Sequence, residues 1–121
     1  MTELENTNAA LIRHLSLLPN DNLFAQIGAN ILGEHRGAFP RPFSKLVEEG
    51  HRWFAETETA ICNHLCNLPV ARSLVDESDQ VHLALTLMGL LGHVVEPVNV
   101  ACLAIILSRI GIREICSAYW T

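Results

Sequence analysis

Three residues that commonly bind metal ions, Cys62, His64 and Cys66, lie within the short segment ICNHLC. A structural zinc site needs four Cys or His ligands arranged as a tetrahedron. On the helix expected here, Cys62 and Cys66 share a face, whereas His64 points well away from both. The chain also contains no CxxC pair and no HExxH motif. We therefore predict that these cysteines are buried thiols, which behave as small apolar side chains.

Glu58 is the acidic residue whose position bears most on chemistry. It falls inside the apolar arc of the predicted third helix, with His51 and Cys62 along the same flank. A carboxylate that faces a core is costly unless it is paired or hydrogen-bonded. One hypothesis makes Glu58 a metal or ligand group, or a general base, helped by a histidine from another helix. In the alternative, Glu58 lies at the edge of the arc and reaches water or an arginine. His51 and Glu58 lie about 10 Å apart along a helix, so they could meet only through a third group.

Histidine is frequent in this chain, which has six. Two of them, His82 and His93, lie in a polar stripe with Thr86 and Gly89 on the predicted fourth helix. They are roughly 16 Å apart on a straight helix, too far to share one metal ion. They could contribute to two sites or line a groove, but we expect the stripe to face water. We predict no cofactor.

Signatures of catalysis are absent from the sequence. It contains no GxSxG elbow, no P-loop and no dinucleotide-binding glycine pattern. The acidic residues cannot be paired across a cleft from the sequence alone. The sequence therefore favours a protein without enzymatic activity.

The composition predicts a single helical domain over 1–121. Half of the 121 residues are apolar and only 17% are charged, below the usual quarter. The net charge is −5 and the basic residues are scattered, which argues against binding to nucleic acid. The N-terminal segment lacks the basic and apolar regions of a secretion signal. We therefore expect a cytoplasmic protein whose four cysteines are reduced.

Apolar residues recur at helical spacing along the chain, and no segment alternates like a strand. The pattern predicts an all-α fold, a compact bundle of about five helices with a central apolar helical hairpin over 80–110. Five prolines divide the helices. The predicted helices begin at Asn6 or Thr7, at the turn Pro19–Asp21, at Ser44, at Gln80 and at Pro97. They are predicted to end before Pro19, at Gly33, at Asn67, at Val95 and at Ile110, with a short helix in 70–79 and a last turn or two after Gly111.

The segment 36–44 is the most irregular part of the chain, because two prolines exclude a helix there. We expect a connector that is held to the core by Phe39 and Phe43. A recognition loop is the alternative.

The hairpin over 80–110 decides what kind of surface this protein has. Each of its arms is shorter than the about 20 apolar residues that span a bilayer, so we predict no membrane insertion. The second arm is apolar on every side, which is typical of a helix that is enclosed or shared between subunits. We predict that this arm is partly enclosed by the chain and partly shared between two subunits. A homodimer would bury the apolar surface that one chain cannot cover. The predicted interface comprises Val98, Ala101, Cys102, Ala104 and Ile105.

Two hypotheses for function follow. The first is a small soluble adaptor or regulatory module that binds itself and another protein. The alternative is a helical metal- or small-ligand-binding protein, or an enzyme, that uses Glu58 with histidines. Its weaker candidate residues are His51, Glu58, Cys62, His82 and His93.

Overall fold

The structure is a computed structural model that describes residues 3–33, 41–95 and 97–120. All regular elements in these ranges are helices, as the apolar spacing predicts. They are α1 (Glu3–Leu15), α2 (Asn20–Leu32), α3 (Phe43–Leu65), α4 (Pro69–Ser73), the 3₁₀ helix η2 (Leu74–Asp76), α5 (Gln80–Leu91), α6 (Pro97–Ile110) and α7 (Ile112–Cys116).

The predicted bundle of about five helices is matched in part: the five long helices are present, and the predicted short helix in 70–79 and last turn after Gly111 are counted as further helices, α4 and α7. Within the described ranges the chain forms seven α-helices and one 3₁₀ helix. The additional α-helices, α4 and α7, have five residues each. Each begins after a local break, α4 at Pro69 and α7 after Gly111, whose φ of 98° favours glycine. Segments this short have no clear period in the sequence, because their stability depends on packing against other helices.

The predicted helix ends are correct in part. Asp79 caps α5, since its side chain accepts hydrogen bonds from the backbone N–H groups of Val81 and His82. Pro97 is the first residue of α6, and Gly33 ends α2 in the left-handed conformation.

Other predicted ends are wrong by a few residues. Helix α3 begins at Phe43, after Pro42 and without a side-chain cap, so Ser44 is not its cap, whereas α2 begins at Asn20, within the predicted turn. The helix α5 ends at Leu91 rather than at Val95, and α3 ends at Leu65 rather than at Asn67. Proline sets an extended conformation by itself and therefore does not require a capping hydroxyl.

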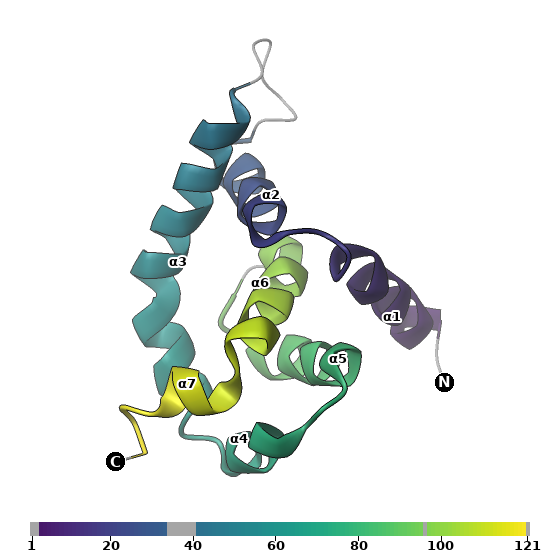
Figure 1. Cartoon of the computed structure of the whole chain (residues 1–121), viewed down its shortest axis with the longest axis vertical. Coiled ribbons are helices and arrows are strands. Elements are labelled where there is room, and N and C mark those ends of the chain that lie inside the picture. The colour runs from purple at the N-terminus through teal and green to yellow at the C-terminus, as the bar shows by residue number, and fades with distance from the viewer. Residues whose placement is uncertain (1–2, 34–40, 96, 121) are drawn as a thin grey trace.

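Helix α6 is the centre of the fold. Figure 1 shows it between α3 on one side and α1 and α5 on the other, and it packs against α1, α2, α5 and α7. All residues from Asn99 to Leu107 are buried. The apolar residues of α6 over this range are therefore covered by the chain's own helices.

The residues predicted to form a dimer interface lie in this core. Ala101 and Cys102 are 5% and 2% exposed, and Ala104 and Ile105 are 0% exposed. The side chain of Val98 lies outside the described residues. A second chain could contact the four buried residues only if α6 lost its present cover.

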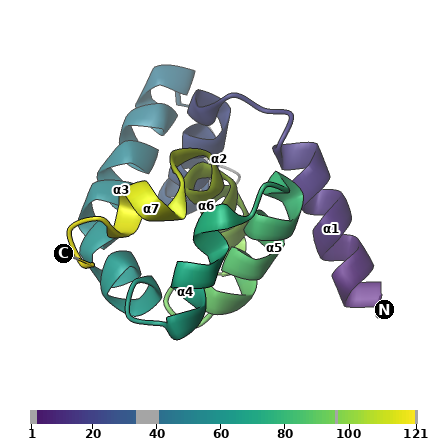
Figure 2. The ribbon, with the colours of Figure 1, turned by 60° about the horizontal axis from the view of Figure 1, so that its bottom comes forward.

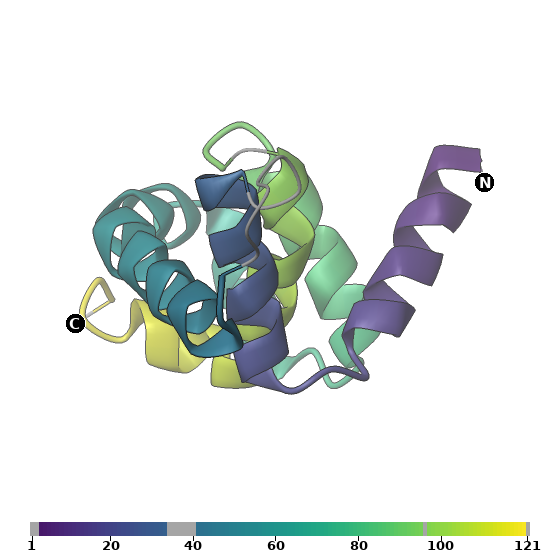
Figure 3. The same ribbon diagram turned by 90° about the horizontal axis from the view of Figure 1, so that it is seen from above.

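Helices α2 and α3 cross at very short range through two glycines. A Cβ atom on Gly28 would collide with the backbone of Leu46, and one on Gly50 would collide with the backbone of Phe24. The order of these pairs along the chain makes the two helices antiparallel, and Figure 3 shows them side by side. Helix α3 continues through Gly50, which brings the helices together.

Arg109, near the end of α6, ties the turn between α1 and α2 to the core. Its guanidinium donates hydrogen bonds to the Asn20 side chain at 2.7 Å, and to the carbonyls of Ser16 and Leu18 at 3.0 and 2.7 Å. A guanidinium suits such a site because it presents several donors in a fixed plane. The bonds position α1, which lies at one side of the molecule in Figure 3.

A disulfide joins Cys66, directly after α3, to Cys116, the last residue of α7. The two Cα atoms are 5.5 Å apart and both cysteines are buried. The indole N–H of Trp120 donates to the carbonyl of Cys66 at 2.9 Å, and the Arg72 guanidinium lies 4.6 Å from the Trp120 ring centroid. Figure 2 shows α7 beside the C-terminal part of α3.

The prediction of four reduced cysteines is therefore wrong for this pair. Only a fold that returns α7 to α3 places Cys66 and Cys116 within bonding distance, and their separation of 50 positions in the sequence hides that contact. Cys62 is a buried free thiol, as the sequence predicts, and Cys102, which was predicted at a dimer interface, is a buried free thiol within the chain.

Of the two phenylalanines predicted to hold the segment 36–44 to the core, the structure describes only Phe43. Phe43 opens α3 and is 52% exposed, so it does not hold a connector to the core. Phe39 lies outside the described residues. Among the helices that the structure describes, none combines the length and the apolar character needed to cross a membrane.

Candidate functional site

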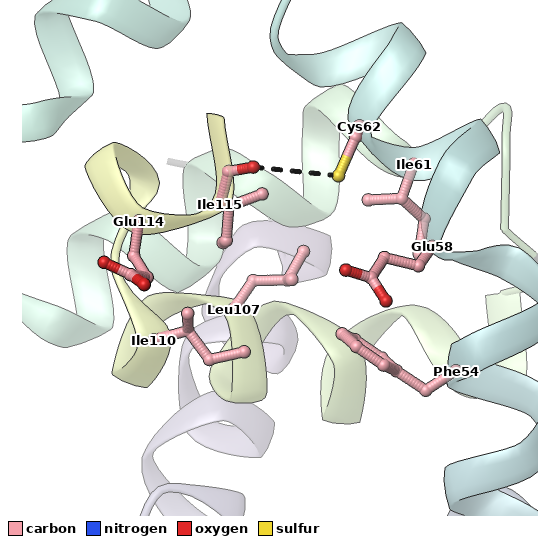
Figure 4. Close-up of a pocket in the computed structure, with 8 residues that line it drawn as sticks. All are labelled: Phe54, Glu58, Ile61, Cys62, Leu107, Ile110, Glu114 and Ile115. Atoms are coloured by element: carbon pink, nitrogen blue, oxygen red, sulfur yellow. Dashed lines mark hydrogen bonds between the residues drawn. The ribbon is translucent and has the colours of Figure 1, made fainter. Parts of the chain in front are cut away.

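A cavity of about 220 Å³ lies between α3, α6 and α7. Its walls are largely apolar, and Figure 4 shows its side chains converging from the three helices. The disulfide positions α7, which supplies one of the walls. The lining residues are Phe54, Glu58, Ile61, Cys62, Leu107, Ile110, Glu114 and Ile115.

Two carboxylates belong to this cavity. Figure 4 shows the Glu58 carboxylate directed toward the space bounded by Phe54 and Leu107, whereas the carboxylate of Glu114 points away from it. Both residues are exposed, and neither makes an ion pair with any residue that the structure describes. Of the two hypotheses for Glu58, a position at the edge of the apolar arc fits its exposure. Its carboxylate nonetheless faces a cavity.

Cys62 lines the cavity opposite Ile115 of α7. Its thiol donates a long hydrogen bond of 3.9 Å to the carbonyl of Ile115. Burial raises the pKa of the Cys62 thiol, and the negative charge of Glu58 raises it further. Both effects disfavour the thiolate, which is the nucleophilic form of cysteine. Cys62 is therefore a wall of the cavity and a poor nucleophile at neutral pH.

The predicted histidines lie elsewhere. His51 stacks on Phe24 with ring centroids 3.8 Å apart, on the side of α3 that faces α2. His82 lies 3.8 Å from the Glu77 carboxylate, and His93 is exposed after the end of α5. His64 forms a 2.9 Å hydrogen bond with the carbonyl of Leu90.

The structure thus brings together Glu58 and Cys62 of the predicted candidates and separates them from His51, His82 and His93. Within the described ranges, no three His, Cys, Asp or Glu residues are grouped so that they could hold a metal ion. The cavity offers apolar contact and the negative charge of Glu58.

Six lining residues were not candidates in the sequence: Phe54 and Ile61 of α3 and, from another part of the chain, Leu107, Ile110, Glu114 and Ile115. The last four are the ones that α3 alone could not indicate. They follow one another around the break at Gly111, where the chain turns from α6 into α7. A pairing of Cys66 with Cys116 would have indicated them, because it places α7 against α3. The sequence alone allows several cysteine pairings, so this signal was not decisive.

Comparison with known families, with curated proteins and with solved structures gave no match.

Proposed function

We propose that this protein is a small helical interaction module, an adaptor or regulatory partner, that binds one side chain of another protein in the cavity between α3, α6 and α7. The cavity itself carries the proposal. Its walls include the apolar side chains of Ile61 and Leu107, and Ile110 at its edge is 43% exposed. Protein interfaces gain most of their affinity where one anchor side chain fills a pocket of this kind.

The size of the cavity supports a side chain rather than a whole metabolite. Pockets for drug-sized ligands usually measure about 300–1,000 Å³. The present cavity, of about 220 Å³, is smaller than this range. A partner would bury one side chain there and spread its remaining contacts over the surrounding surface.

The second candidate function is the binding of a metal ion or small ligand through Glu58. Of the residues that this function requires, Glu58 and Cys62 line the cavity, whereas the histidines lie elsewhere in the structure. Elemental analysis of the purified chain tests it. Stoichiometric zinc or iron that is lost in Glu58→Gln would favour this function over side-chain docking.

A selection of peptides tests the proposed docking. A random peptide library displayed on phage is panned on the full chain, and the selected peptides are measured on two variants. Ile110→Trp fills the edge of the cavity, whereas Ile31→Trp is a matched control, because Ile31 on α2 is also 43% exposed and does not line it.

We expect peptides that bind the unmodified chain and Ile31→Trp equally and lose binding to Ile110→Trp. Peptides that bind all three proteins alike, or a library that yields no binder, would contradict docking in this cavity.

Self-association and location belong to the same proposal. We expect a homodimer, whose contact must use residues exposed on the folded chain, such as Leu17, which is 82% exposed. The cytoplasmic location stays a prediction, and the disulfide argues against it, because disulfides persist mainly in oxidising compartments.

A further inference from the structure

We infer that the partner side chain in the cavity is cationic, a lysine or an arginine of another protein, whose aliphatic stem lies along the apolar wall while its charged group meets Glu58. The inference rests on the proposed docking function and names the chemistry of the partner.

The charges around the cavity are of one sign. Two of its eight lining residues, Glu58 and Glu114, are acidic and none is basic. The Glu58 carboxylate faces the cavity in Figure 4. An occupant that carries a carboxylate would be repelled there, and a purely apolar one would leave the Glu58 charge without a partner. A cationic group is the occupant that complements it.

Helix α3 neutralises its buried carboxylate, Glu49, but offers no cation to the exposed Glu58. Lys45 and Arg52 each approach the Glu49 carboxylate at 3.1 Å, one turn before and after it. Around Glu58, the positions three and four residues away hold Phe54, Ala55, Ile61 and Cys62, and none of these can pair with a carboxylate. The helix thus provides an intrahelical cation at one site and omits it at the site that faces the cavity.

The apolar wall fits the rest of such a side chain. Lysine and arginine bury their methylene stems against apolar surface while the charged end stays near water or a counter-ion. Ile61 and Leu107 offer that surface beside the Glu58 carboxylate. The charge of Glu58 acts across the cavity wall, since it contributes to the raised pKa of the Cys62 thiol.

The test uses the peptides selected by their dependence on the cavity. Their sequences are aligned, and the affinity of each for Glu58→Gln is compared with that for Glu56→Gln by isothermal titration calorimetry. Glu56→Gln is the matched control, because Glu56 is an exposed glutamate of the same helix that does not line the cavity.

We expect one position of the peptides to be fixed as lysine or arginine. Affinity should fall at least about tenfold in Glu58→Gln, the size of a lost charged hydrogen bond. It should change little in Glu56→Gln and should also fall with added salt. Replacing the fixed lysine or arginine by norleucine should remove the difference between the unmodified chain and Glu58→Gln.

Other results distinguish failure of the cationic partner from failure of the proposed docking function. Cavity-dependent peptides with a fixed apolar residue, and with equal affinity for Glu58→Gln and Glu56→Gln, would overturn the cationic partner and leave docking in place. A selection without any cavity-dependent peptide would overturn both. A stretch of fixed acidic residues would contradict the sign of charge on which the inference depends.

Discussion

The thiol of Cys102 lies in the core, where α6 packs against α2. Its Sγ donates to the Gln26 side-chain oxygen at 3.6 Å, and burial raises its pKa to about 11 from 9.0. A raised pKa means that the folded chain disfavours the thiolate relative to the unfolded chain. The resulting contribution to stability is fully present below pH 9 and is lost as the pH rises from 9.0 toward 11.

Cys102→Ser should remove this pH dependence, because a serine hydroxyl does not ionise in that range. We expect the free energy of unfolding to fall less steeply between pH 9 and 11 in the variant than in the unmodified chain, as measured by urea denaturation. Other groups titrate equally in both proteins and cancel in the difference. Parallel curves for the two proteins would show that Cys102 does not ionise in that interval.

The crossing of α2 and α3 depends on the absence of two side chains. Alanine is usually the better helix former, by about 1 kcal/mol relative to glycine. At Gly28 and Gly50, however, the added Cβ would meet the backbone of the neighbouring helix. A backbone cannot turn aside as a flexible side chain can, so the helices would have to separate.

We expect Gly28→Ala and Gly50→Ala each to lower the free energy of unfolding by about 2 kcal/mol or more. Gly89→Ala is the control, because nothing lies within 4 Å of a Cβ atom at Gly89 on α5. That variant should be more stable by up to about 1 kcal/mol. Chemical denaturation followed by circular dichroism measures all three. Stabilisation by all three changes would mean that the helices cross at a greater distance.

The disulfide between Cys66 and Cys116 fixes the position of α7 against the end of α3. Counting thiols in the denatured chain tests it: two should react before reduction and four afterwards, since Cys62 and Cys102 are free. Reduction should lower the free energy of unfolding by about 2–4 kcal/mol, because the cross-link restricts the unfolded chain. Four reactive thiols before reduction would mean that Cys66 and Cys116 are unpaired.

How much of this fold could be predicted depends on the kind of element. The apolar spacing predicts α5 and α6 and the central place of the hairpin, and Asp79 and Pro97 mark their starts. The last turn after Gly111 is predicted and forms α7, but its place against α3 is not, because that depends on Cys116 meeting a residue 50 positions earlier. Half of the cavity comes from the end of α6 and from α7, so the sequence indicates Glu58 and Cys62 but not Glu114 or Ile115.

The burial of Ile105 inside the chain predicts that a charge at this position disrupts folding before it affects assembly. Ile105 is 0% exposed inside the chain, so Ile105→Glu should reduce the free energy of unfolding by more than about 4 kcal/mol and yield insoluble protein. Ile110→Glu changes the same helix at a position that is 43% exposed and should fold normally.

Light scattering at tens of micromolar measures the predicted homodimer, which has twice the chain mass of 13.4 kDa. Leu17→Lys should return it to the monomer, because a lysine at the exposed position 17 would oppose apolar contact there. An unmodified chain that scatters as a monomer would end the homodimer prediction and would leave docking in the cavity as it stands.

The bond between Cys66 and Cys116 also determines how the molecule responds to mechanical force. It closes a covalent loop that contains α4, η2, α5, α6 and all but the last residue of α7. A pull on the two ends of the chain would be carried across the bond and would bypass everything within the loop. The fully stretched oxidised chain should therefore be shorter than the reduced one by roughly 170 Å, at about 3.4 Å for each bypassed residue. Under load, the central helix α6 would lose its neighbours α1 and α2 and yet could not itself be drawn out.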